Sequence, residues 1–150
     1  MEQLNFKHYP LSLKNRENKR YIFDVVRKKD ILLTPEEWVR QHCLHYLLID
    51  KKYPISLINI EKKLKVYGRD KRYDIIIYTP QGDVTLLVEC KAPHVTIDQA
   101  VFDQIARYNL SAKSQYLMVT NGLIHLFCQM DYAQQVYHFL YDLPAYTPAL

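Results

Sequence analysis

Three residues with the chemistry of metal-assisted hydrolysis lie on two neighbouring predicted strands: Asp74, Glu89 and Lys91. Glu89 and Lys91 are separated by one residue, so on a strand both side chains project from the same face. Asp74 comes directly before the apolar residues 75–77, and Glu89 comes directly after the apolar residues 86–88. Strands of an α/β domain are often buried on both faces, so charges at their ends need partners.

The segment between the two carboxylates predicts that they lie close together. Residues 72–91 contain two β-rich runs joined by the turn sequence TPQGD, which is typical of a hairpin. With a two-residue turn at Gln81-Gly82, the register places Asp74 directly opposite Glu89. A glycine bulge at the turn would shift that register by one residue.

Two neighbouring carboxylates repel each other, and burying each costs several kcal/mol. A divalent cation removes both penalties, and oxygen ligands of this kind suit Mg²⁺ or Mn²⁺. We therefore predict that Asp74 and Glu89 bind the metal. The ammonium of Lys91 would orient the attacking water or stabilise the charge of the transition state. The alternative interpretation is a structural ion pair, for example between Asp74 and Lys91.

The surrounding pattern predicts an α/β domain with a mixed sheet. A helix should begin after the N-cap Thr34, with Pro35 at its first position, and end before Pro54. A second helix is expected at residues 97–112. The predicted buried positions are Val39, Cys43, Leu44, Leu47 and Leu48 in the first helix and Ile97, Val101, Ile105 and Leu110 in the second. Strands are expected at 57–67, 72–78, 84–91 and 115–120, and over LIHLFCQM, with a further strand or short helix in the tail VYHFLYDLP.

These motifs resemble those of the PD-(D/E)xK nuclease superfamily, and most of all the N-terminal nuclease domain of type I restriction enzyme R subunits and small stand-alone relatives. The matching elements are Asp74, Glu89-Cys90-Lys91, the helix start Pro35–Gln41 and the segment Gln104–Tyr108. The residue before Asp74 is Tyr73, where the name of the superfamily has proline. The resemblance covers roughly residues 34–130.

The resemblance implies a restriction-endonuclease-like fold, in which helices flank a central mixed sheet, and Mg²⁺-dependent hydrolysis of DNA. It assigns metal binding to Asp74 and Glu89 and a catalytic role to Lys91. It also implies a supporting acid on the first helix, for which we prefer Glu36; for Glu37 we favour stabilisation of the helix dipole. Gln104 is expected to touch the site or the DNA.

The charge distribution divides the chain into a basic N-terminal arm, residues 1–33, and a single nuclease-like domain, residues 34–150. Within the arm, residues 21–33 are expected to form one or two short extended pieces. Residues 1–29 hold eight Lys or Arg against three acids, within a formal net charge of +4 for the 150 residues. Basic residues before Asp74, and one tyrosine, are candidate DNA contacts: Arg69, Lys71, Arg72 and Tyr108. Plain solvation of the basic residues, and a place in the core for the tyrosine, are the alternatives.

Several other classes of protein are not supported. None of the three glycines begins a G-x-x-x-x-G-K-[ST] loop, so an ATP-driven motor or a specificity subunit would act in trans. The three cysteines form no CxxC pair, and Cys43 and Cys128 should be core residues. We expect a cytoplasmic protein without membrane segments. The alternative to a nuclease is a catalytically weak, nuclease-like module for DNA binding or assembly.

Overall fold

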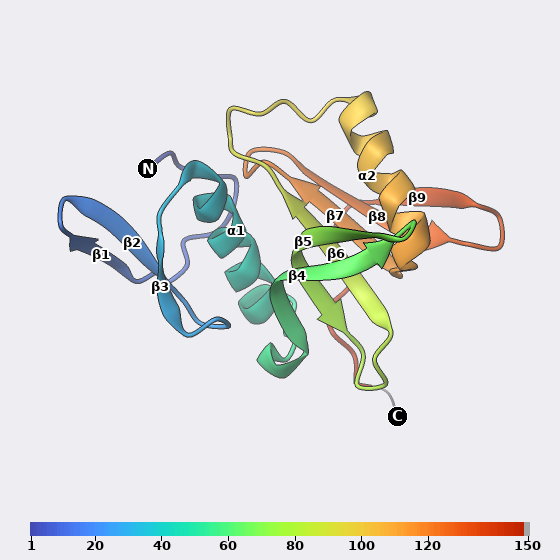
Figure 1. Cartoon of the computed structure of the whole chain (residues 1–150), viewed down its shortest axis with the longest axis horizontal. Helices are drawn as coiled ribbons and strands as arrows, with labels where there is room; N and C mark the ends of the chain where they lie inside the picture. Colours follow the sequence, from blue (N-terminus) through green and yellow to red (C-terminus); the bar gives the residue numbers. More distant parts are fainter. Residues whose placement is uncertain (149–150) are drawn as a thin grey trace.

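The computed structural model describes residues 1–148, and a six-stranded sheet forms its centre (Figure 1). In spatial order its strands are β4 (Ile58–Val66), β5 (Arg69–Tyr78), β6 (Val84–Cys90), β7 (Tyr116–Thr120), β8 (His125–Asp131) and β9 (Val136–Leu140). Among these strands β6 and β7 alone run parallel. A parallel pair needs a crossover connection, which contains helix α2 (Gln99–Ala112). The prediction of an α/β domain with a mixed sheet is confirmed.

Helix α1 (Pro35–His45) begins as the sequence predicts. The Thr34 hydroxyl accepts a hydrogen bond from the backbone N–H of Glu37 at 3.1 Å, which satisfies one free donor of the first turn. The predicted stripe is buried, with Leu48 only partly so. The helix continues as one π-helical turn over Tyr46–Asp50 and ends before Pro54. Through this stripe, α1 packs against one face of the sheet.

Helix α2 covers the opposite face and is capped by Asp98, whose Oδ1 accepts from the Val101 N–H at 2.9 Å. It begins at Gln99, two residues later than predicted. The prediction that Leu110 is buried was wrong, because the neighbouring Asn109 takes the inward position. The amide oxygen of Asn109 accepts a hydrogen bond from Ser114 and so ties the end of α2 to the following turn.

Residues of β5 and β6 alternate between two apolar clusters, one under each helix. Ile75 and Val88 belong to the cluster beneath α1, whereas Ile76 and Leu87 belong to the cluster beneath α2. All four are fully buried. Both strands are therefore apolar on both faces, as expected for the centre of an α/β sheet. Polar side chains are confined to their ends.

The predicted hairpin of β5 and β6 is confirmed. Gly82 has φ +94°, a backbone conformation that residues with a Cβ rarely adopt. Ile75 pairs with Val88, and the register shifts once, between Ile77 and Tyr78. Strand β5 begins earlier than predicted, because it pairs with β4 along a long basic hairpin whose tip lies beyond the predicted start.

The N-terminal region forms a separate three-stranded antiparallel sheet of β1 (Leu13–Arg16), β2 (Lys19–Asp24) and β3 (Lys29–Leu32). Strand β1 was not expected; all four of its residues are exposed, so it shows no burial pattern. Before it, the Asn5 N–H donates to the Gly122 carbonyl at 2.8 Å, and Leu4 packs into the core. The N-terminal segment is thus bound to the body of the protein.

Two further expectations concern cysteines and membranes. Cys43, Cys90 and Cys128 are free thiols, and all three are buried, as predicted for Cys43 and Cys128. Within residues 1–148, no helix combines the length and the apolarity that crossing a bilayer requires.

Candidate metal and nucleic-acid site

Asp74 lies where the ladder between β5 and β6 opens. Ile75 and Val88 are the last residues paired, and the same register sets Asp74 opposite Glu89 as predicted, although this register holds only beyond the shift between Ile77 and Tyr78. The Oδ2 of Asp74 accepts a hydrogen bond from the backbone N–H of Cys90 at 2.7 Å. The β6 backbone therefore fixes the orientation of this carboxylate.

Glu89 is a buried carboxylate, with 6% of the residue exposed. Its Oε1 lies 3.3 Å from the Nζ of Lys71 on β5. Burial, and then the charge of Asp74, raise the pKa of Glu89 to about 7. The two carboxylates are thus close enough to oppose each other's ionisation, and Lys71 compensates only part of that cost.

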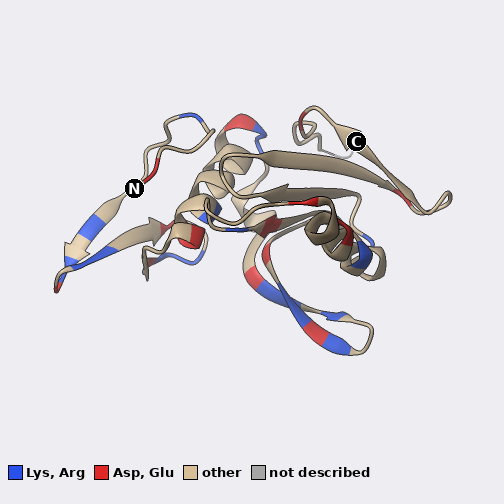
Figure 2. Cartoon of the chain, turned by 90° about the horizontal axis from the view of Figure 1, so that it is seen from above, with Lys and Arg blue, Asp and Glu red and all other residues tan. Residues whose placement is uncertain are grey.

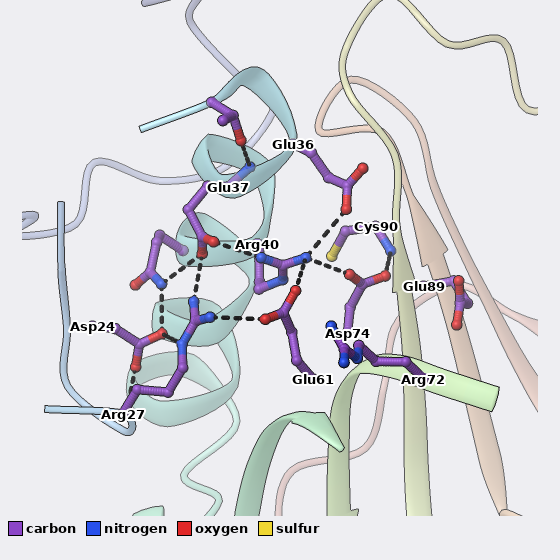
Figure 3. A network of polar contacts seen from close by, with 12 residues as sticks. Asp24, Arg27, Glu36, Glu37, Arg40, Glu61, Arg72, Asp74, Glu89 and Cys90 are labelled. Atoms are coloured by element: carbon purple, nitrogen blue, oxygen red, sulfur yellow. Dashed lines mark hydrogen bonds and ion pairs between the residues drawn. The ribbon is translucent and has the colours of Figure 1, made fainter. Parts of the chain in front are cut away.

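The two carboxylates point in different directions. Leu87, which shares a strand face with Glu89, lies in the apolar cluster under α2, whereas Asp74 contacts Arg40 on α1. Figure 3 shows Glu89 turned away from the ion-pair network that holds Asp74. Among the described residues, no three His, Cys, Asp or Glu side chains form a group that could hold a metal ion. The site therefore offers a carboxylate pair and not a closed cage.

Arg40 joins α1 to the site. Its Nη2 lies 2.7 Å from Oδ1 of Asp74 and 3.1 Å from Oε1 of Glu36, and its Nη1 lies 2.5 Å from Oε1 of Glu37. Burial alone would lower the pKa of Arg40, but the neighbouring carboxylates, Asp74 first, raise it. The sequence indicates the two ion pairs within the helix, because Glu36 and Glu37 stand four and three residues before Arg40, the spacings at which side chains meet on a helix.

A second arginine extends the network to the N-terminal sheet (Figure 3). Arg27 bonds Asp24 at 2.8 Å, Glu37 at 2.9 Å and Glu61 at 3.2 Å. Glu61 also lies 3.5 Å from Arg40. Sequence reasoning missed Arg27, Glu61 and Asp24, because their partners are distant along the chain and only the fold brings them together.

The backbone of Glu61 is strained at this position. Its φ of +53° lies in the left-handed region, which costs a non-glycine residue roughly 1 kcal/mol or more. The distortion coincides with the one missing pair in the β4–β5 ladder, where Glu61 would face Asp74. Both carboxylates point instead toward Arg40. Strain of this kind clusters at functional sites.

Glu36 and Glu37, the two candidate helix acids, occupy different environments. Glu37 is buried and ion-paired with both Arg27 and Arg40, so it does more than stabilise the helix dipole. The side chain of Glu36 is 49% exposed. Burial and the charge of Asp74 raise the pKa of Glu36. Glu36 is therefore the helix acid that faces both the solvent and the site, and Glu37 holds the network together.

A groove of about 650 Å³ lies beside Glu89, between α2 and the tip of the β4–β5 hairpin. Its lining includes four of the predicted residues: Arg69, Lys71, Gln104 and Tyr108. Lys71 lies 5.0 Å from the ring of Tyr73 and 5.9 Å from that of Tyr108, close enough for a cation–π contact. The structure thus gathers these residues in one groove, and Lys71 connects that groove to Glu89. Arg72 is exposed on β5 and does not line the groove.

A second cavity of about 500 Å³ lies on the α1 side, lined among others by Glu36, Arg40, Glu61 and His94. Lys91 follows the end of β6, where its backbone N–H donates to the Thr120 carbonyl. Its charge lowers the pKa of Glu36 and of Glu89, after larger effects of opposite sign. Among residues 1–148, Lys91 forms no ion pair within 4.0 Å. The alternative interpretation, an ion pair between Asp74 and Lys91, is therefore not observed, and Asp74 pairs with Arg40 instead.

Two helices lie on opposite faces of a mixed sheet, with one acid in the middle of β5 and one near the end of β6. This arrangement defines a restriction-endonuclease-like fold. Residues 35–144 match the family described as type I restriction enzyme R protein N terminus. The chain belongs to this family, which confirms the resemblance seen in the sequence and indicates a nuclease-related role in DNA processing. No curated protein and no solved structure matches the chain.

Proposed function

We propose that this protein hydrolyses phosphodiester bonds in DNA with the help of Mg²⁺ or Mn²⁺ held by Asp74 and Glu89. The charge of the site carries the proposal. Six carboxylates lie in or beside the network: Asp24, Glu36, Glu37, Glu61, Asp74 and Glu89. Four cations, Arg27, Arg40, Lys71 and Lys91, lie among them. The formal balance of these groups is negative when all are ionised, and it stays negative when Arg72 beside Asp74 is added, which favours binding of a cation.

The donor set suits such an ion. Mg²⁺ keeps most of its water and takes one or two protein carboxylates, so no third ligand is needed. Because Asp74 and Glu89 point in different directions in this structure, holding one ion with both requires one of the two side chains to turn. When bound, the metal supplies an activated water and stabilises charge on the scissile phosphate. Arg40 and the Cys90 N–H orient Asp74, while Lys71 partly compensates Glu89.

The remaining residues bind and orient the substrate. Lys91 has no ion pair within residues 1–148, so its ammonium is available to a phosphate or to an attacking water. Arg69 and Gln104 line the groove beside Glu89 and supply polar contacts to the DNA backbone. Tyr108 forms an aromatic wall of the same groove. We place any ATP-driven motor or specificity function outside these 150 residues, because they contain no phosphate-binding loop.

Cleavage of plasmid and linear DNA with Mg²⁺, Mn²⁺ and no metal tests the proposal. We expect metal-dependent cleavage that Lys91→Ala reduces by at least about 100-fold, since one charge-stabilising group contributes that much. Lys113→Ala is the matched control, because Lys113 is exposed at the far end of α2. This variant should cleave DNA at the rate of the parent. Equal rates for the parent and Lys91→Ala under every metal would refute the enzymatic proposal.

A second candidate function is DNA binding or assembly with little hydrolysis. One observation favours it: Asp74 already accepts hydrogen bonds at both oxygens, from Arg40 and from Cys90. A metal would compete with that arrangement. This candidate predicts salt-dependent DNA binding that survives Asp74→Ala in EDTA. Binding that is lost whenever the metal is removed would contradict it.

A further inference from the structure

The N-terminal sheet is joined to the candidate site by buried ion pairs, although it lies outside the matched residues 35–144. Arg27, in the turn between β2 and β3, bonds Asp24 of β2 and Glu37 of α1 at 2.8 and 2.9 Å. Asp24 also accepts from the Gln41 amide at 2.8 Å. Asp24 and Gln41 are fully buried. Breaking a buried pair of this kind costs about 3–5 kcal/mol, so the sheet is firmly held beside the site.

The same sheet forms a wall of the cavity next to Asp74. Ile31 and Leu32 of β3 line the cavity of about 500 Å³ that also contains Glu36 and Arg40. A polymer bound across this cavity would therefore continue onto the N-terminal sheet.

The sheet also carries an excess of positive charge. Residues 13–32 contain seven Lys or Arg and three acids, so their net charge is +4. This equals the formal net charge of the whole chain. The remaining residues are therefore neutral in sum. Figure 2 shows Lys and Arg along two hairpins that project from the body, β1–β2 and β4–β5, while β7, β8 and β9 carry none. The β4–β5 hairpin already borders the groove beside Glu89.

The pairing of β1 with β2 determines which side chains face the solvent. Ile22 is fully buried and points toward the body of the protein. Side chains of opposite parity point away: Lys19 and Tyr21 on β2, with their partners Arg16 and Lys14 on β1. Arg16 lies 5.3 Å from the ring centre of Tyr21. The outer face is thus a basic surface with an aromatic side chain in its middle.

Asp30 is the acid on this outer face, 3.3 Å from Lys14 and 3.1 Å from Arg16. One carboxylate shared by two exposed cations leaves a positive surplus, and Lys19 adds a third cation nearby. Exposed ion pairs of this type are worth about 1 kcal/mol or less, so a phosphate can displace them at little cost.

We propose that the outer face of the N-terminal sheet, formed by Lys14, Arg16, Lys19 and Tyr21, is a second phosphate-contacting surface for the DNA that enters the site. This inference rests on the proposed function, because it takes DNA as the substrate. The DNA is held on one side of the carboxylate pair by the β4–β5 groove and on the other by this sheet. The footprint on DNA extends beyond the part of the chain that the family describes.

Binding of a short fluorescein-labelled DNA duplex, measured by anisotropy over a series of salt concentrations, tests the inference. The parent is Asp74→Asn in EDTA, so that binding is read without cleavage. We expect Lys14→Gln with Lys19→Gln to lower the salt slope by nearly 2 and the affinity by about tenfold or more, since each phosphate contact contributes about 0.9 to the slope. Lys52→Gln with Lys113→Gln is the matched control, because both lysines are exposed and follow the far ends of their helices.

Three results would overturn the inference, and one of them reaches further. An unchanged slope in the Lys14 and Lys19 variant shows that the sheet contacts no phosphate. An equal loss in both double variants shows that net charge alone sets the affinity. If the parent binds no DNA at low salt in EDTA, the inference fails, and if it also binds none with Mg²⁺ the proposed function fails as well. Normal binding by the parent with either of the first two results leaves the proposed function intact. Unfolding midpoints in urea should agree among all variants, since the replaced side chains are exposed.

Discussion

Replacing Glu89 by Gln should stabilise the metal-free protein at alkaline pH. Burial raises the pKa of Glu89 from 4.5 to about 7, which corresponds to about 3 kcal/mol of unfavourable free energy once the carboxylate is ionised. Gln keeps the size of the side chain and removes the charge. The raised pKa already includes the opposing attraction of the partly exposed Lys71, so that ion pair is not subtracted again. The expected net gain is about 3 kcal/mol near pH 8.

The sign of this effect changes predictably with pH. The folded pKa lies above the unfolded value, so the fold favours the protonated acid. Below about pH 4.5 Glu89 is protonated in both states and costs nothing as a charge. As pH rises toward and through 7 the folded protein must ionise a buried group, and stability falls. The advantage of Glu89→Gln should therefore vanish near pH 4 and grow to its full size by about pH 8.

Urea unfolding in EDTA at several pH values measures this difference. The thermal midpoint should rise by roughly 5–10 °C near pH 8, as expected for a chain of this length. Glu2→Gln is the matched control, since Glu2 is exposed at the N-terminus and its replacement should change little. A variant that is less stable than the parent at all pH values, or equally altered at pH 4 and pH 8, would refute the reasoning.

Three other changes test the packing around the site, each by urea unfolding. Arg40→Met should cost about 3–5 kcal/mol, because it leaves buried carboxylates such as Glu37 without their partner; a loss below 1 kcal/mol would show that the network is not needed for stability. Thr34→Ala should cost about 1 kcal/mol through the lost helix cap, and Thr34→Ser should restore most of it. Gly122→Ala should destabilise by at least about 1 kcal/mol, because an added Cβ would lie 2.8 Å from Leu4 and φ is +87°; no change would mean that the N-terminal segment yields freely.

Local patterns in the sequence were sufficient for the elements that carry the site. The Thr34-Pro35 start of α1, the turn at Gly82 and the apolar runs of β5 and β6 each act over a few residues, and each was predicted correctly. The predicted pairing of Asp74 with Glu89 is correct, but the turn alone does not produce it. Beside the turn Tyr78 pairs with Val84, one residue away from the register of a two-residue turn, and the shift between Ile77 and Tyr78 restores that register. Short-range geometry of this kind is readable from a single sequence.

Contacts between distant segments were not predictable. Arg27 meets Glu61 across 34 residues, and Arg40 meets Asp74 across another 34. No periodicity links such positions, since their meeting depends on how the N-terminal sheet and α1 pack against β4 and β5. Strand β1 was missed for a related reason: an exposed strand has no apolar alternation to reveal it. The opposite orientations of Asp74 and Glu89 likewise arise from the opened strand end, which a regular register does not anticipate.

Two unfavourable features of this structure lie at the candidate site, and they bear on its function. Glu89 is a carboxylate whose pKa is raised to about 7, and Glu61 is held in left-handed backbone. A binding module with no need for a metal could replace Glu89 by Gln and gain stability. A metalloenzyme could not, because the same charge would bind its cation. The two functions therefore differ in how Mn²⁺ acts on stability: a metal site gives the parent a thermal midpoint that rises with Mn²⁺ concentration. That rise should be lost in Glu89→Gln, whereas a metal-independent module would respond alike in both proteins.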